Sequence, residues 1–254
     1  MELNFKVFGE GKPLVILHGL MGSLDNWQTL GKRFAENRKV YLVDQRNHGK
    51  SFHSDDHTYP LMIQDLHRFL EQQGLEQVDL IGHSMGGKTA MGYSVEHPYM
   101  IDRLVVVDIA PRKYPVHHDQ ILNGLNAVDF TKVASRKEVE EIISPYIPEF
   151  GVRQFLMKNV HWVDKGRLGF KFNLAAISKD IEKIGYGVAE DAYFSNPTLF
   201  IDGEKSDYIQ ESDIDQIDMI FPRNEIITFD NCGHWVHAEN PELFFNTINE
   251  FLHV

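Results

Sequence analysis

The sequence predicts an α/β fold in which helices cover both faces of a mostly parallel sheet. Short apolar runs alternate with helix-like stretches through residues 1–110, and the same alternation returns from residue 197 onward. Strands that are apolar throughout are typical of buried parallel sheets. Between these two parts the alternation stops, and the chain turns to mixed helices rich in aromatic residues. We therefore expect a core of residues 1–110 and 197–254 that carries a mainly helical lid of residues 111–196.

The expected strands of the core follow from their apolar patterns. The first, residues 3–8, alternates in the manner of a strand, and the later ones are continuous apolar runs bounded by loop or turn residues. The strands are expected at residues 3–8, 14–17, 40–43, 78–81, 101–107, 198–201 and 225–229.

The expected helices follow helical spacing of apolar side chains or begin after a capping residue. They are expected at residues 27–36, 60–73, 85–97, 212–221 and 241–252 in the core, and at 119–128, 137–146, 152–159 and 174–184 in the lid. Asp25 or Asn26 should cap the first helix and Asn240 the last, because a short polar side chain accepts hydrogen bonds from free N–H groups.

The composition limits the possible functions. The chain has 254 residues, of which 43% are hydrophobic and 24% charged, as in an ordinary globular protein. Its formal net charge of -12 argues against nucleic acid or anionic membranes as partners, because both require a basic surface. A single cysteine, Cys232, excludes an intrachain disulfide. We see neither a leader pattern nor an apolar run of about 18 residues, and therefore expect a cytoplasmic protein without a membrane span.

A Gly-x-Ser-x-Gly motif, Gly82–Gly86, stands between an expected strand and an expected helix. A serine at so sharp a turn has a strained backbone and exposes its hydroxyl, and the flanking glycines give the turn room. The N–H of Met85 then lies at a helix N-terminus, where it can face an oxyanion. The motif predicts Ser84 as a nucleophile.

The same stretch, Gly82–Thr89, also matches the phosphate-binding P-loop pattern, with residues 104–108 as a possible magnesium-binding partner. A P-loop usually follows the first strand of its sheet, whereas this one would follow the fourth. That interpretation also leaves His18-Gly19 and Gly233-His234 unexplained. We therefore favour a serine hydrolase over a nucleotide-binding protein.

Several histidines are candidates for a role in catalysis or metal binding. His234 follows the last expected strand, from where it can reach back to Ser84 as a base. His18 ends an early strand, and we expect it to be a structural loop histidine. Further histidines and aspartates gather in one loop: His48, His53, His57, Asp55 and Asp56. Their spacing matches no ligand pattern, so we predict no metal site.

Four motifs together resemble the α/β-hydrolase family. They are His18-Gly19, the Asp44-x-Arg-x-His-Gly-x-Ser51 run, Gly82–Gly87 and Gly233–Trp235. More closely, the chain is similar to small bacterial esterases of the YbfF type, at residues 18–27, 44–49, 83–88, 108–111, 172–173 and 233–239. The resemblance runs nearly end to end and is weakest in the lid. It implies hydrolysis of esters and acyl thioesters, including acyl-coenzyme A, without a metal or organic cofactor.

The acid of the expected triad has two candidates, Asp108 and Asp207, because both satisfy the chain order Ser, acid, His of this fold. Many members place the acid three residues after a glycine, but here Gly203 plus three is Ser206. Asp207 lies four residues after Gly203, one residue later than the acid of those members. The resemblance to YbfF-type enzymes implies Asp108.

The expected mechanism is acyl transfer through an acyl-enzyme on Ser84, with His234 as base and Asp108 orienting it. The N–H groups of Leu20 and Met85 form the expected oxyanion hole. C–C bond hydrolases and lyases of the same fold share this triad, and a non-catalytic binding protein on the fold is a third alternative. The sequence gives neither the acyl length, the leaving group nor the oligomeric state.

Overall fold

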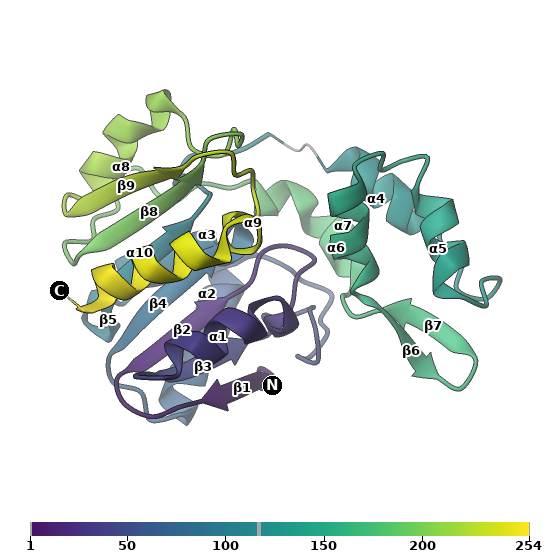
Figure 1. Ribbon diagram of the computed structural model, residues 1–254, viewed down its shortest axis with the longest axis horizontal. Coiled ribbons are helices and arrows are strands. Elements are labelled where there is room, and N and C mark those ends of the chain that lie inside the picture. The colour runs from purple at the N-terminus through teal and green to yellow at the C-terminus, as the bar shows by residue number, and fades with distance from the viewer. Residues whose placement is uncertain (1, 116–117, 254) are drawn as a thin grey trace.

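The computed structural model describes residues 2–115 and 118–253 (Figure 1). Within these residues a seven-stranded sheet has the order β1-β3-β2-β4-β5-β8-β9. Its strands are β1 (Phe5–Phe8), β2 (Pro13–Leu17), β3 (Lys39–Val43), β4 (Val78–His83), β5 (Ile101–Val107), β8 (Thr198–Gly203) and β9 (Asn224–Phe229). Only β1 runs antiparallel to its neighbour in this described sheet. The predicted α/β fold with a mostly parallel sheet is confirmed.

Helices cover both faces of the sheet, and the alternation along β2 shows how. Leu14 and Ile16 pack in one core with α1 (Gln28–Phe34) and α10 (Pro241–His253), whereas Val15 and Leu17 pack in another with α2 (Tyr59–Gln72), α3 (Met85–Glu96) and α8 (Ile214–Ile220). In Figure 1, α1 and α10 lie in front of the sheet and α2 and α3 behind it. The central strands are therefore buried on both faces, which explains their unbroken apolar runs.

Short helical turns complete the core. The 3₁₀ turns are Leu24–Trp27, Pro98–Met100 and Glu211–Asp213, and α9 (Val236–Glu239) precedes α10. The predicted cap of α10 is present, since Asn240 Oδ1 accepts from the Leu243 N–H at 3.3 Å. The prediction for the first helix was wrong. Asn26 lies inside the first turn and accepts from the N–H of Ser23 at 2.8 Å, so the helical segment begins earlier than expected.

The segment between β5 and β8, residues 111–196, is called the insert below. It contains α4 (Asp119–Asn126), α5 (Arg136–Ile143), α6 (Phe150–Met157) and α7 (Leu174–Ile184), and most of its apolar side chains pack in a second core that also includes Met21. In Figure 1 these helices stand to one side of the sheet. Among the described residues, no helix is both long enough and apolar enough to span a bilayer.

A hairpin in the insert was not predicted. It pairs β6 (Val160–Asp164) with β7 (Arg167–Phe170) around Gly166, whose φ is +82°. The signal was present as β-branched and aromatic residues on either side of a Lys-Gly turn. Its aromatic residues were expected to belong to a lid core, but Trp162 is 55% exposed.

The insert leaves and re-enters the core at one place. The N–H of Tyr114 donates to the carbonyl of Gly185 at 2.7 Å, and the N–H of Val188 donates to the carbonyl of Pro111 at 2.8 Å. The returning chain then joins the core, where Phe194 is fully buried. The two ends of the insert are thus held side by side.

Candidate active site

Ser84 lies at the sharp turn between β4 and α3, with φ 53° and ψ -117°. A side chain at Gly82 would clash with the carbonyl of Gly86, as the motif predicted. A Cβ at Gly86 would instead lie 2.6 Å from the carbonyl oxygens of Leu17 and His18, at the end of the neighbouring strand β2. The two glycines are therefore required for different reasons, and together they permit the strained backbone at Ser84.

Asp108 follows β5 and is completely buried, with a φ of 52°. Its Oδ1 accepts from the Gly203 N–H at 3.1 Å, and its Oδ2 accepts from the Ser206 hydroxyl at 2.6 Å. The Nδ1 of His234 lies 2.6 Å from the same Oδ2. Three donors thus converge on one buried carboxylate, which fixes its orientation toward His234.

His234 is positioned by its ring and by its backbone. With Nδ1 donating to Asp108, the neutral imidazole presents Nε2 as an acceptor. Tyr208 stacks on the ring at 4.2 Å between centroids, and His83 Nε2 donates to the His234 carbonyl at 2.9 Å. The residue before Ser84 therefore holds the loop that bears the expected base.

Asp207, the second candidate acid, is exposed at the surface. The contacts found for it run through its backbone carbonyl, which accepts from Arg112 at 3.2 Å. Ser206 occupies the position where many relatives of the fold were expected to carry the acid, and it donates to Asp108 instead. The sequence marked residue 206 as the usual position of the acid, but it gave no sign of the hydrogen bond from Ser206 to Asp108.

A second carboxyl group, that of Asp202, lies beside Asp108 and was not anticipated. Its Oδ1 is buried and finds no donor within the described part of the chain, and Thr228 donates to its Oδ2 at 3.4 Å. Burial, followed by the charge of Asp108 and contact with it, raises the pKa of Asp202 to about 7. Asp202 therefore carries a proton below neutral pH and adds no second charge beside Asp108.

The loop after β2 carries Leu20, which lines a small cavity together with Ser84 and Met85. His18 is structural, as expected: its Nε2 accepts from the Gln45 N–H at 3.1 Å and its Nδ1 donates to the Gly19 carbonyl at 2.8 Å. Because both ring nitrogens are bonded to the backbone, His18 fixes the loop and is not available as a base.

Two further side chains hold this loop at Met21. His48 Nε2 accepts from the Met21 N–H at 3.0 Å, and the side-chain amide of Asn159 donates to the Met21 carbonyl at 2.7 Å. Asn159 comes from the insert, so the insert bonds directly to the loop that carries Leu20. Sequence reasoning missed both contacts.

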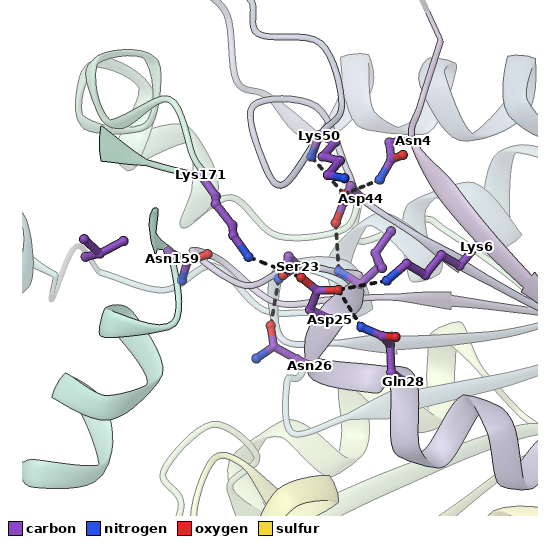
Figure 2. A network of polar contacts seen from close by, with 12 residues as sticks. Asn4, Lys6, Ser23, Asp25, Asn26, Gln28, Asp44, Lys50, Asn159 and Lys171 are labelled. Carbon is purple, nitrogen blue, oxygen red and sulfur yellow. Dashed lines mark hydrogen bonds and ion pairs between the residues drawn. The ribbon is translucent and has the colours of Figure 1, made fainter. Parts of the chain in front are cut away.

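Asp44 anchors the next turn of the loop, as Figure 2 shows. Its carboxylate accepts from the N–H of Leu24 at 2.7 Å, from the side chain of Asn4 at 2.7 Å and from the N–H of Lys50 at 2.9 Å. Gly49 has a φ of +59°, and a side chain there would clash with the Asp44 carboxylate. The motif of residues 44–51 is thus a brace for the Leu20 loop.

The histidines near this brace do not form a metal cluster. His48 and His57 are completely buried, with ring centroids 5.3 Å apart. Burial lowers the pKa of His48 and lowers that of His57 to about 4, so both are neutral. In residues 2–115 and 118–253, no three potential ligands of the His, Cys, Asp or Glu type gather at one point.

Lys88, which a P-loop would aim at phosphate, is turned away from the sharp turn that carries Ser84. The residue is 2% exposed, and its ammonium group donates to the carbonyls of Pro111, at 2.9 Å, and Arg112. Burial lowers its pKa to about 7. This placement makes Lys88 a support for the chain after β5 and speaks against phosphate binding.

Two cavities meet at Ser84. The inner one has a volume of about 30 Å³ and is lined by Leu20, Tyr59, Met85 and Ile184, among others. The outer one, of about 210 Å³, also contains His234. Beyond the rings of Phe155 and Trp235, which bound the outer cavity, lies a surface cleft of about 510 Å³.

Known proteins are similar to this chain along most of its length. A family described as alpha/beta hydrolase fold matches residues 12–131. The chain is 39% identical over 247 residues to the sn-1-specific diacylglycerol lipase ABHD11 of Mus musculus, covering 94% of this chain and 80% of the relative. It is 36% identical over 241 residues to the esterase YbfF of Escherichia coli (strain K12), covering 94% and 92%. Among solved structures, a marine microorganism esterase superposes with a TM-score of 0.96 at 43% identity, covering 98% of this chain and 99% of that one.

Proposed function

The chain belongs to the α/β-hydrolase family, among its esterases and lipases, and we propose that it cleaves carboxylic esters and acyl thioesters through an acyl-enzyme on Ser84. The observation that carries the proposal is the 2.6 Å contact between His234 Nδ1 and the buried Asp108 carboxylate, in a cavity that also contains Ser84. An acid held in this way fixes the tautomer in which His234 can accept the serine proton.

In the proposed reaction, Ser84 attacks the acyl carbonyl while His234 takes its proton, and Asp108 stabilises the imidazolium that results. The N–H groups of Leu20 and Met85 stabilise the oxyanion. Losing one such donor costs about 10²–10³ in rate in other hydrolases. The alcohol or thiol departs with the proton from His234, and water then releases the acid by the same steps in reverse order.

The two cavities suggest which part of the substrate goes where. His234 must reach the departing oxygen or sulfur, and it lines the outer cavity but not the inner one. We therefore place the leaving group in the outer cavity and the acyl group in the inner cavity. The outer cavity shares Phe155 and Trp235 with the surface cleft, which offers room for a long leaving group such as a lipid alcohol or the coenzyme A thiol.

Ser84→Ala should lower turnover of p-nitrophenyl butyrate and of butyryl-coenzyme A by at least about 10⁴-fold, because the acyl-enzyme can no longer form. Both reactions are followed by absorbance with folded protein. An unchanged rate in the variant would rule out Ser84 as nucleophile. Ester turnover without thioester turnover would remove the thioester part of the proposal. A wild-type protein inactive on both substrates would favour C–C bond cleavage or ligand binding.

Ser206→Ala should lower kcat by about tenfold or more, because a hydrogen bond to a charged group is worth about 1.5–3 kcal/mol. The loss should fall on kcat with little change in KM, since the hydroxyl bonds Asp108 and so acts on the chemical step. Ser212→Ala, at an exposed position in the 3₁₀ turn Glu211–Asp213, is the control and should leave kcat unchanged. A kcat in Ser206→Ala equal to that of the wild type would contradict the assigned role.

A further inference from the structure

A large cavity lies behind the inner cavity and plays no part in the proposed reaction. It has a volume of about 480 Å³ and is bounded by the start of α2, the middle of α3 and the chain after α7. Its lining is mostly apolar: Tyr59, Pro60, Ile63, Val95, Tyr186, Val188, Ala189 and Ala192. We call it the rear cavity. Its size and chemistry suit an aliphatic chain.

Tyr59 lines both the inner cavity and the rear cavity. Its hydroxyl donates to the carbonyl of Ile184 at 2.8 Å, which fixes the ring against the end of α7. Tyr59 and Ile184 also belong to one apolar cluster with Met85, next to Ser84. The ring of Tyr59 therefore stands between the reacting serine and the rear cavity.

The inner cavity is small, at about 30 Å³, so a long acyl chain cannot fit within it. The opposite direction is taken by the leaving group, since His234 lies on that side. Tyr59 is the described residue that both cavities share, so an acyl chain that extends from Ser84 toward the rear cavity meets its ring. This argument rests on the proposed function, because it assumes an acyl group bound at Ser84.

We propose that Tyr59 is the residue that limits the acyl chain to short lengths, and that the rear cavity receives the far end of a longer chain once this ring is removed. The substrate class of the wild-type protein is then the short-chain acyl esters. Tyr59 acts on specificity by its bulk, and its hydroxyl serves to hold the ring.

The test is the ratio of kcat/KM for p-nitrophenyl octanoate to that for p-nitrophenyl butyrate. In the wild type this ratio should be below about one tenth, although apolar burial favours each added methylene by about fourfold where space exists. Tyr59→Ala should raise the ratio at least tenfold. Tyr59→Phe, which keeps the ring, should retain the wild-type preference.

A second substitution tests whether the rear cavity holds the chain. Ala189 is exposed at its rim, so Ala189→Trp should fill the cavity and reverse the gain when combined with Tyr59→Ala. Glu190→Trp, an exposed neighbour outside the lining, is the control and should leave the gain intact. If Tyr59→Ala does not fold, Tyr59→Leu provides the same opening in part and is expected to shift the ratio in the same direction.

Several results would overturn the proposal. If the wild-type protein cleaves the octanoate as well as the butyrate, the Tyr59 ring does not limit the acyl chain. An active Tyr59→Ala or Tyr59→Leu variant with an unchanged ratio would show that the ring does not limit the chain, while leaving the proposed function intact. A gain that survives Ala189→Trp would place the chain elsewhere. A wild-type protein inactive on every ester would refute the proposed function, and this inference with it.

Discussion

Asp108→Asn should lower kcat for p-nitrophenyl butyrate by about 10⁴-fold while changing KM little. The buried carboxylate accepts hydrogen bonds from Gly203, Ser206 and His234, and an amide offers only one oxygen to these donors. Its NH₂ group would face a donor, and His234 would turn to the tautomer with its proton on Nε2. That tautomer cannot take the proton of Ser84, so the loss falls on the chemical step.

The matched control is Asp207→Asn, which makes the same chemical change one residue after Ser206. Asp207 is exposed, and the contacts found for it use its carbonyl rather than its carboxylate. Its kcat should stay within about twofold of the wild type, as is usual for a surface substitution. Both variants should be checked for folding by circular dichroism before the kinetics. A severe loss in Asp207→Asn with an active Asp108→Asn would reverse the assignment of the acid.

Stability should fall steeply as the pH is lowered from 7 to 5.5, because the fold buries neutral histidines. These are His18, His48, His57, His83 and His237, none more than 5% exposed. Burial lowers the pKa of each, to about 4 for His57 and about 3 for His237. Below about pH 6.5 the unfolded chain binds protons that the folded chain does not, so stability is lost as the pH falls. Each such histidine costs about 1.4 kcal/mol per pH unit in that range.

Asp202 acts in the opposite direction. Its pKa is raised to about 7, so the folded state binds this proton more tightly than the unfolded state does. Its contribution to stability is therefore present at low pH and is lost as the pH rises through 7. One such group opposes five histidines, so the net stability should still fall on acidification.

Urea denaturation at pH 7.5, 6.5 and 5.5 measures this effect. His57 is the sharpest probe, because neither of its ring nitrogens has a partner among the described residues. His57→Phe keeps a ring in place and should flatten the pH dependence by about 1.4 kcal/mol per unit. His253→Gln, at the exposed end of α10, is the control and should leave the slope unchanged. Equal midpoints at pH 7.5 and 5.5 would mean that the buried histidines do not control acid stability.

The sequence predicted the parts of the fold that local patterns determine. Alternation located the first strand of the described sheet and apolar runs located the other six, and α7 begins and ends where its spacing indicated. The hairpin β6–β7 was missed because no element was expected between residues 159 and 174, where the aromatic residues were attributed to the lid core. Each of its strands has only five or four residues, and so short a pattern does not distinguish a strand from a loop.

The candidate site likewise contains residues that local patterns predicted and residues that they did not. Ser84 was predicted from a turn with strict steric demands, and His234 from its place after the last strand. The choice between Asp108 and Asp207 depends on burial and on which side chains converge, which chain order does not encode. The contacts of Ser206 and Asn159 join segments far apart in the sequence, so the letters alone gave no sign of them.

The hydrogen bonds that join the two ends of the insert at Pro111 and Val188 affect how freely the protein can be altered there. Since the ends already touch, replacing the intervening chain changes the entropy of loop closure by only about 0.6 kcal/mol for each doubling of length. A different insert can therefore be grafted at this point without rebuilding the sheet. Such a graft must replace the amide of Asn159 that bonds Met21 and the ammonium group of Lys171 that pairs with Asp25, because both contacts tie the insert to the loop that carries Leu20. The insert can therefore be exchanged only together with the contacts that hold the Leu20 loop in place.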